Sequence, residues 1–383
     1  MIPPHKKIVG VALVLILLAI VFMMVQRFSK EYAVVEKSDQ VVTKAVTDPE
    51  PPVNLAQASS KSFPKMAPMA TPSVPKPKLV IAITPPVTPP KPISVAPAGA
   101  STGATLLSGC QVFPRDNPWN TDISSYPVHP NSAAYVASIG GSGHLHADFG
   151  GNGEYGIPFT VVPQGAPRVP ITFTAYGDES DAGPYPVPLT APVEGGASSD
   201  GDRHVLVLEQ GVCKLYELYR SFQVGQEWNA DSGAVYDLGS NKLRADYWTS
   251  ADAAGLPILP GLVRYDEVAA GAVTHAIRFT VQRTQKGFIH PATHYASNRS
   301  DASLPPMGLR MRLRADFDIS KFMGQSRVIL EGMKKYGIIL ADNGSNWYLT
   351  GAADPRWNDD DLNQLKTVPG SAFEAVDTGG IIH

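Results

Sequence analysis

The segment GDRHVLVLEQGVCKLYELYRS (201–221) decides the fold. Two apolar runs of strand composition, Val205–Leu208 and Lys214–Tyr219, flank a short Glu-Gln-Gly-Val turn. Runs of this kind on either side of a turn that contains glycine predict a β-hairpin. A long, turn-rich segment follows as far as Glu267 and is dense in Asp, Arg, Ser and Trp. Because buried strands that lead into structured loops often build pockets, we expect a β-rich domain with a site near this segment.

Shorter runs of strand composition recur through the C-terminal part and are separated by Gly and Pro. Within 310–317, apolar and charged residues alternate, which is typical of a strand with one buried face. Helices are predicted over Ser326–Tyr336, from apolar spacing, and over Asp359–Lys366, which opens with acidic residues. Strands dominate, so we predict a β-sandwich or jelly roll with a few helices. The further strand-like runs are Ile157–Val162, Val169–Ala175, Thr274–Gln282, Ile338–Ala341 and Trp347–Thr350.

A membrane anchor is predicted at the N-terminus. Residues 8–25 are an unbroken uncharged run, preceded by Lys6 and Lys7, and they are long enough to span a bilayer as a helix. A cleaved signal peptide is the alternative, but neither a small-x-small cleavage site nor a lipobox cysteine ends this run. We expect residues 1–7 in the cytoplasm and a single-pass signal anchor over 8–25 in a bacterial inner membrane. The C-terminal domain then lies in the periplasm or the extracellular space.

The segment 26–104 is predicted to be a disordered spacer, and 105–383 one globular domain. Fourteen of the residues in 45–104 are proline, among many Ala, Ser, Thr and Lys. Such a composition cannot bury a core and favours extended, polyproline-like chain. The layout of anchor, Pro/Lys spacer and outer domain resembles that of TonB, a resemblance of composition that implies topology alone. A passive tether is the preferred interpretation, and a proline-rich ligand for a partner is the alternative.

The charge is distributed unevenly along the chain. Residues 1–104 carry eleven Lys and Arg against five Asp and Glu, whereas the remainder carries 21 against 30. Nucleic-acid binding requires clustered Lys and Arg that neutralise phosphates, so an acidic folded domain argues against a nucleic-acid partner. We expect the partners to be the membrane, through the anchor, and a glycan or another cell-envelope polymer.

Two cysteines, Cys110 and Cys213, fall in the predicted domain. An even pair in an exported domain predicts one disulfide, which would tie the start of the domain to the hairpin. Two buried free thiols are the alternative. A zinc site would need more ligands than two distant cysteines.

Several phrases between Phe113 and Glu374 together resemble a group of secreted bacterial β-rich proteins. The resemblance implies that this whole stretch is one integral domain, and it carries no catalytic residues across. The phrases are DNPWN (116–120), PVHPNS (127–132), YGIP (155–158), GDRH (201–204), WTSADAAGLPILPGLVRYDE (248–267), PPMGLR (305–310) and ADNGSNWYLTG (341–351).

Histidine pairs suggest metal sites as alternatives to a domain without a cofactor. On a strand, His144, His146 and Asp148 would share one face and could converge on a zinc ion. A similar segment of metallo-β-lactamase-like hydrolases has a further His after the Asp, where this chain has Phe149. The alternative is a loop with structural hydrogen bonds. The pair His290 and His294 has the spacing of two zinc ligands on a helix but lacks the Glu of a zincin. The acidic turn 178–181 could hold Ca²⁺ through its oxygen ligands, but it lacks an EF-hand pattern.

Carboxylates are the stronger catalytic candidates. Glycoside hydrolysis uses two carboxyls about 5–10 Å apart, one of them with a raised pKa. Glu217 and Asp252 are the first candidates, with Asp202 and Asp181 in reserve. Glu217 could instead lie on an exposed face or pair with a nearby arginine, and Asp252 could be a helix cap or loop anchor. The predicted substrate-binding residues are Arg203, His204, Trp248, Arg264 and Tyr185.

These features predict a membrane-anchored, extracytoplasmic, carbohydrate-active domain, with glycoside hydrolysis as the first hypothesis. A non-catalytic glycan- or protein-binding sandwich on a tether is the main alternative. A polysaccharide lyase and a metal-dependent hydrolase are further alternatives. For the lyase, His275 and Arg278 would point to opposite faces of a strand and could not act together directly. The chain has no Gly-x-Ser-x-Gly elbow and no phosphate-binding glycine loop.

Overall fold

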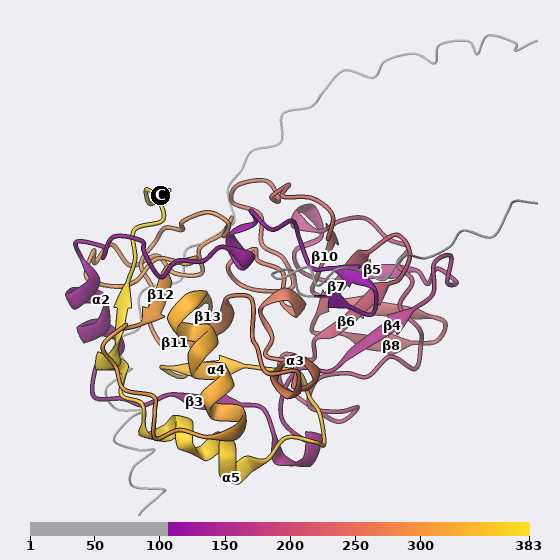
Figure 1. Cartoon of the computed structure of the whole chain (residues 1–383). Helices are drawn as coiled ribbons and strands as arrows, with labels where there is room; N and C mark the ends of the chain where they lie inside the picture. Colours follow the sequence, from indigo (N-terminus) through magenta and orange to yellow (C-terminus); the bar gives the residue numbers. More distant parts are fainter. Residues whose placement is uncertain (1–105) are drawn as a thin grey trace, which may run out of the picture. The chain divides into compact units, whose positions relative to one another are not determined.

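The computed structural model describes residues 106–383 (Figure 1), so the predicted anchor (8–25) and the predicted spacer (26–104) lie outside the described residues. Strands hold 27% of residues 106–383 and helices 18%, and the strands form several sheets. The β-rich domain is therefore confirmed, whereas its arrangement as a sandwich or jelly roll stays a prediction. Within 106–383, every helix is too short or too polar to cross a membrane.

The predicted hairpin is confirmed and forms the middle of a four-stranded sheet. Its strands are β6 (Val205–Glu209) and β7 (Lys214–Tyr219), which pair antiparallel. The sheet order is β10-β7-β6-β4, with β10 (Ser232–Asp237) antiparallel to β7 and β4 (Phe159–Val162) parallel to β6. Every residue of β6 is buried, which explains its continuous apolar run. The sheet lies on the right of Figure 1.

A six-stranded mixed sheet forms the other half of the core, in the order β15-β12-β13-β11-β14-β3. Its central strands β11 and β13 run parallel, and the chain crosses between them through β12 and helix α4 (Gly324–Lys335). Helix α4 packs on this sheet through Ile329, Leu330 and Met333 (Figure 1). The strands are β3 (His146–Asp148), β11 (Ile277–Val281), β12 (Arg310–Leu313), β13 (Ile338–Asn343), β14 (Tyr348–Thr350) and β15 (Phe373–Ala375).

Both predicted helices are present, and shorter elements join them. The second predicted helix is α5 (Asp359–Leu362), which continues as a 3-10 turn over Asn363–Thr367. Helices α2 (Ser132–Ile139) and α3 (Tyr265–Ala269) were not predicted. The remaining strands are β1 (Leu106–Leu107), β2 (Cys110–Gln111), β5 (Ile171–Phe173), β8 (Phe222–Val224) and β9 (Glu227–Ala230). Further 3-10 turns cover Pro118–Asn120, Gly151–Gly153, Gly177–Glu179, Leu259–Gly261 and Gly370–Ala372.

The prediction of a half-buried strand over 310–317 was wrong. Strand β12 ends at Leu313, and both of its faces are buried. Arg312, expected in solvent, forms an ion pair with Glu374 and donates hydrogen bonds to the backbone carbonyls of Ile123, Ser124 and Tyr126. The segment around residues 118–126 covers this face, and its carbonyl groups make burial of the arginines possible.

The predicted disulfide between Cys110 and Cys213 is confirmed. Their Cα atoms lie 5.5 Å apart and 103 positions apart in sequence. The bond ties strand β2 to the turn of the central hairpin. It therefore restricts most of the unfolded chain between the start of the domain and its core.

We expect the Cys110→Ser/Cys213→Ser variant to lose about 2–4 kcal/mol of unfolding free energy, because the long loop is no longer closed in the unfolded state. Urea unfolding of wild type and variant measures this difference. A loss below roughly 1 kcal/mol would show that strain in the folded state or residual structure in the unfolded state offsets the stabilisation from loop closure. Equal thiol counts with and without reductant would show that the bond does not form.

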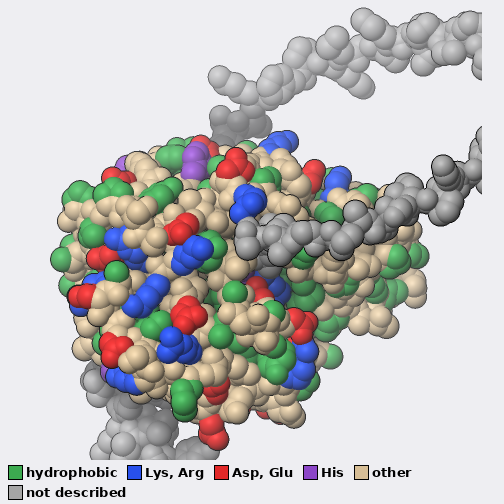
Figure 2. Space-filling model, in the orientation of Figure 1, with side chains coloured by type: hydrophobic (Ala, Val, Ile, Leu, Met, Phe, Trp, Pro, Cys, Tyr) green, Lys and Arg blue, Asp and Glu red, His purple; other side chains and the backbone are tan. Residues whose placement is uncertain are grey.

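Charges of both signs are interspersed on the described part of the face in Figure 2, where Lys and Arg alternate with Asp and Glu. Phosphate backbones are bound by clustered Lys and Arg. This face therefore does not carry the charge pattern of a nucleic-acid interface.

Candidate functional site

A cavity of about 420 Å³, named here the Asp342 pocket, lies between the central hairpin and the six-stranded sheet. Its volume is within the range of small-ligand sites. Its walls come from the start of β6, the loop after β10, the chain near residue 294 and the end of β13. The lining residues are Tyr176, Asp202, His204, Tyr219, Ser232, Thr249, Ser250, Ala251, Asp252, Ala253, His294, Ala296, Asp342 and Asn343.

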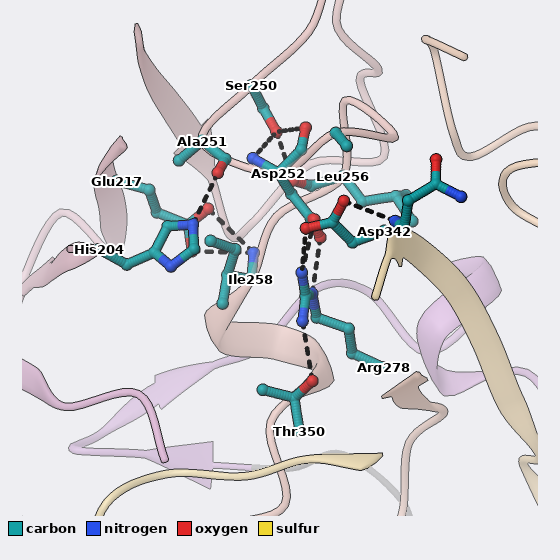
Figure 3. Close-up of polar contacts among 12 residues, drawn as sticks. His204, Glu217, Ser250, Ala251, Asp252, Leu256, Ile258, Arg278, Asp342 and Thr350 are labelled. Atoms are coloured by element: carbon teal, nitrogen blue, oxygen red, sulfur yellow. Dashed lines mark hydrogen bonds and ion pairs between the residues drawn. The ribbon is translucent and has the colours of Figure 1, made fainter. Parts of the chain in front are cut away.

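Arg278 connects two carboxyl groups of the pocket lining, those of Asp252 and Asp342 (Figure 3). Its Nε and Nη2 atoms donate to the two carboxylate oxygens of Asp252, at 2.8 and 2.7 Å. Nη2 also lies 3.3 Å from Asp342 Oδ2, and Nη1 donates to Thr350 Oγ1 at 2.8 Å. The register of β11 beside β13 places Thr280 opposite Asp342, which brings the arginine and this aspartate together. One buried cation thus holds two carboxyl groups in place.

Asp342 is the carboxyl group best suited to proton transfer. Its side chain is 24% exposed, and its Oδ1 accepts the backbone N–H of Asn343 at 2.6 Å. Burial raises its pKa, the charge of Asp252 raises it further, and Arg278 opposes both, so the pKa reaches about 7. A carboxyl that titrates near neutrality can serve as a general acid or base at physiological pH. Sequence reasoning missed this residue.

Asp252, a predicted catalytic residue, borders the pocket but has a structural role. Its side chain is fully buried, and Arg278 occupies both of its oxygens. Its backbone N–H donates to Ser250 Oγ at 2.9 Å, and Ser250 Oγ donates to the carbonyl of Leu256 at 2.7 Å. Asp252 therefore fixes the loop and the arginine, and the prediction that it anchors a loop fits this placement.

His204 also borders the pocket, as predicted, and both of its ring nitrogens have acceptors. Nδ1 lies 2.6 Å from Glu194 Oε2, and Nε2 lies 3.0 Å from the carbonyl of Ala251. Burial alone would lower the pKa of the ring, but the Glu194 carboxylate overrides it and raises the pKa to about 9. The protonated ring satisfies both acceptors, so His204 is a fixed cation at neutral pH and is not a base.

Asp202 lies in the pocket wall beside His204. Asp202 and His204 both line the pocket, whereas Arg203, which has a φ of +52°, directs its guanidinium to the carbonyls of Ala197, Ser199 and Ser221. The carboxylate of Asp202 is exposed and has no hydrogen bond or ion pair within residues 106–383. It is therefore free to meet a ligand.

His294 supplies a further group that sequence reasoning did not select for catalysis. Its Nδ1 lies 2.8 Å from the carbonyl of Ala253, which assigns the proton to Nδ1. Within residues 106–383, Nε2 has no hydrogen-bond partner, and His294 is part of the pocket lining.

Glu217, the first catalytic candidate, lies outside the pocket. It is fully buried in β7, and its carboxyl accepts the backbone N–H groups of Ile258 and Leu259 at 2.9–3.0 Å. Burial raises its pKa to about 7, against the effect of these donors. The nearby arginines that were candidate partners bind elsewhere: Arg203 donates to backbone carbonyls, and Arg220 pairs with Asp231. Its function is to hold the chain that leads from Asp252 into the 3-10 turn at Leu259.

We expect Glu217→Ala to lower the free energy of unfolding by at least about 3 kcal/mol, because it leaves a cavity and two buried N–H groups without acceptors. Glu217→Gln keeps the volume and one acceptor oxygen, so it should lose less. Urea unfolding of both variants tests this order. Equal stability of Glu217→Ala and wild type would contradict the assigned role.

The other predicted residues are distributed over separate sites. Asp181 forms an ion pair with Arg244 and, with Trp248, lines a different cavity of about 670 Å³. Tyr185 is buried and donates to the carbonyl of Asp181, so its ring is not a stacking surface. Arg264 is buried and paired with Glu267.

Two of the predicted metal ligands, His146 and Asp148, line one cavity, but His144 is not part of its lining. His144 is exposed, and His146 stacks on Tyr348 with ring centroids 4.2 Å apart. Asp148 lies beside Thr350 in the β3–β14 ladder. Within residues 106–383, no three His, Cys, Asp or Glu side chains are arranged to hold a metal ion.

No family model, curated protein or solved structure matches this chain. A function must therefore be inferred from its own residues. The Asp342 pocket combines an aspartate that titrates near pH 7, an unpaired carboxylate at Asp202 and two tyrosines. Proton transfer combined with charge stabilisation is the chemistry that these groups can perform.

Proposed function

We propose that the Asp342 pocket is the active site of a glycoside hydrolase. The observation that carries this proposal is the presence of two accessible carboxyl groups of different character, Asp342 and Asp202, in one cavity. Hydrolysis of a glycosidic bond needs one protonated carboxyl and one ionised carboxylate. Asp342, held by Arg278, is suited to the first role, and the exposed Asp202 to the second.

In this mechanism, protonated Asp342 donates its proton to the oxygen of the leaving sugar as the glycosidic bond breaks. Asp202 either attacks the anomeric carbon directly or takes a proton from the attacking water. Arg278 stabilises the Asp342 carboxylate that remains. Asp252 is a positioning residue, because it acts only through the arginine.

The pocket favours an uncharged glycan over a uronic acid polymer. Its charged lining consists of three aspartates and the buried imidazolium of His204. A lyase requires a cation to neutralise the sugar carboxylate, but Asp252, Asp342 and Thr350 already occupy the guanidinium of Arg278. The rings of Tyr176 and Tyr219 offer faces on which a sugar can stack.

A membrane-anchored location outside the cytoplasm is part of this proposal. The uncharged run 8–25 and the proline-rich spacer support an anchored outer domain. The Cys110–Cys213 disulfide supports an oxidising compartment such as the periplasm.

A non-catalytic glycan-binding module is the second candidate. It is favoured by the hydrogen bonding of His204 and Asp252, because both side chains are bound to other protein groups and are not available for catalysis. Such a module would retain the pocket and its tyrosines and would release no products.

The two candidates are separated by incubating the full-length protein, in a detergent without a sugar headgroup, with uncharged polysaccharides and assaying for new reducing ends. We expect Asp202→Asn to lower the rate by at least about 100-fold, because the second carboxylate is lost. Asp200→Asn, an exposed aspartate outside the pocket lining, is the matched control and should leave the rate unchanged. Glycan retention without products from the wild type would favour the binding module.

A further inference from the structure

A further cavity, of about 530 Å³, lies at the β3 edge of the six-stranded sheet and shares no lining residue with the Asp342 pocket. We name it the Tyr155 groove. Its volume is also typical of a small-ligand site. Strands β3 and β14, the loop around Gly151 and the α5 segment form its walls. The residues are His146, Ala147, Asp148, Phe149, Gly151, Tyr155, Tyr348, Asp359, Leu362, Asn363 and Lys366.

Tyr155 presents a fixed aromatic face in this groove. The residue is 62% exposed, although most large apolar side chains of the domain are buried. The ring packs against Gly151, where a Cβ atom would lie only 2.4 Å from a ring carbon. Gly151 has a φ of +58°, and its N–H donates to Asp359 Oδ1 at 2.9 Å. The backbone is thus shaped to seat an exposed tyrosine.

His146 and Tyr348 add a second aromatic surface. Their rings stack with centroids 4.2 Å apart and planes inclined by 21°. Burial, with a further contribution from the charge of Lys366, lowers the pKa of His146. The imidazole is therefore neutral at pH 7, and the surface has a mainly apolar character.

Several polar groups of the groove have no protein partner. Within residues 106–383, the side chains of Asp148, Asn363 and Lys366 form no hydrogen bond or ion pair. In the Asp342 pocket, by contrast, protein groups saturate the two cationic groups, Arg278 and His204. The groove therefore offers an acceptor, an amide and an ammonium group beside two aromatic surfaces.

We propose that the Tyr155 groove is a second saccharide-binding site, which takes an uncharged segment of a hexose or N-acetylhexosamine chain. A sugar ring has an apolar C–H face that can lie on Tyr155 and hydroxyl groups that can bond to the free polar groups. Asp148 and Asp359 outnumber Lys366, which disfavours polyanionic chains. The site goes beyond the proposed hydrolase, because it binds without taking part in the reaction.

The test is a calorimetric titration of full-length protein that carries Asp342→Asn, so that turnover does not interfere. The detergent must lack a sugar headgroup. The probes are β-1,4-linked hexasaccharides of glucose, of N-acetylglucosamine and of mannose, together with a hexauronate. We expect at least one uncharged probe to bind, and Tyr155→Ala to weaken its binding at least about fivefold. Tyr155→Phe keeps the ring and should retain most of the affinity.

Two tyrosine variants serve as controls. Tyr247→Ala removes an exposed tyrosine outside both cavities and should leave binding unchanged. Tyr176→Ala alters the Asp342 pocket alone and identifies binding at that site. The proposal is overturned if no uncharged hexasaccharide binds, if Tyr155→Ala binds as well as its parent, or if the hexauronate binds more tightly. A failure of hydrolysis in the wild type would leave this titration unaffected.

Discussion

Arg278→Met is expected to lower the free energy of unfolding at pH 7 by roughly 3–5 kcal/mol, because it leaves buried carboxylates without their counter-charge. The guanidinium contacts Asp252, Asp342 and Thr350, and Asp252 has no solvent exposure through which its charge could be screened. Methionine has similar length and fills the volume, so packing loss is a minor part of the effect. Urea unfolding monitored by tryptophan fluorescence measures the difference.

Three further variants test whether charge causes the loss. Arg278→Lys keeps the charge but not the bidentate geometry, so its stability should be intermediate. Adding Asp252→Asn to Arg278→Met removes the unpaired carboxylate and should recover part of the stability. Arg314→Met removes a surface arginine paired with the exposed Asp316 and should cost less than about 1 kcal/mol. A similar loss for both methionine variants, or no recovery in the double variant, would contradict the role of Arg278.

The central hairpin and strands β11, β13 and β14 of the six-stranded sheet could be predicted, because each lies in a local run of strand composition. Val205–Leu208 and Ile338–Ala341 are buried on both faces and therefore read as continuous runs. Strands β8–β10 and helices α2 and α3 could not be predicted from the sequence, because they are short or mixed in composition. Their conformations are set by the neighbours on which they pack. Strand β9, for example, has the sequence EWNA and alternates between half-buried and buried positions.

The pocket was predicted only in part. Asp202, His204 and Asp252 lie in the stretch that the sequence selected, and all three line the pocket. Asp342 comes from a later strand, and the parallel pairing of β11 with β13 brings it to Arg278. This pairing depends on the crossover through α4, which composition and spacing do not reveal. Asp342 directly follows the buried apolar run Ile338–Ala341 within β13, and this position was the one available sign of a functional residue.

Glu217 was correctly singled out as an unusual buried carboxylate, but its role is structural and not catalytic. A carboxylate within the apolar run LYELY does require a special partner. The partners are the backbone N–H groups of Ile258 and Leu259, which no sequence pattern identifies.

Asp342→Asn is expected to reduce glycan hydrolysis by about 100- to 10,000-fold, because asparagine cannot donate the proton that the leaving sugar needs. In the wild type, activity requires the protonated form of Asp342, and burial together with Asp252 holds the pKa of this group at about 7. The rate should therefore fall as the pH rises through 7, and the residual rate of the variant should lack this limb. A pH–rate profile of both proteins provides the test, and the same alkaline limb in the variant would assign the acid to another residue.

The same substitution should change how stability depends on pH. The pKa of Asp342 in the folded protein lies above its ordinary value of 3.8, so protonation favours the folded state. This contribution is fully present below pH 4 and is lost as the pH rises through 7. The variant lacks it, so between pH 4 and 8 the wild type should lose roughly 2–4 kcal/mol relative to Asp342→Asn. Glu217 titrates in the same range in both proteins and cancels from the difference. A difference in unfolding free energy that stays constant from pH 4 to 8 would show that Asp342 is ionised throughout, and that it cannot be the acid.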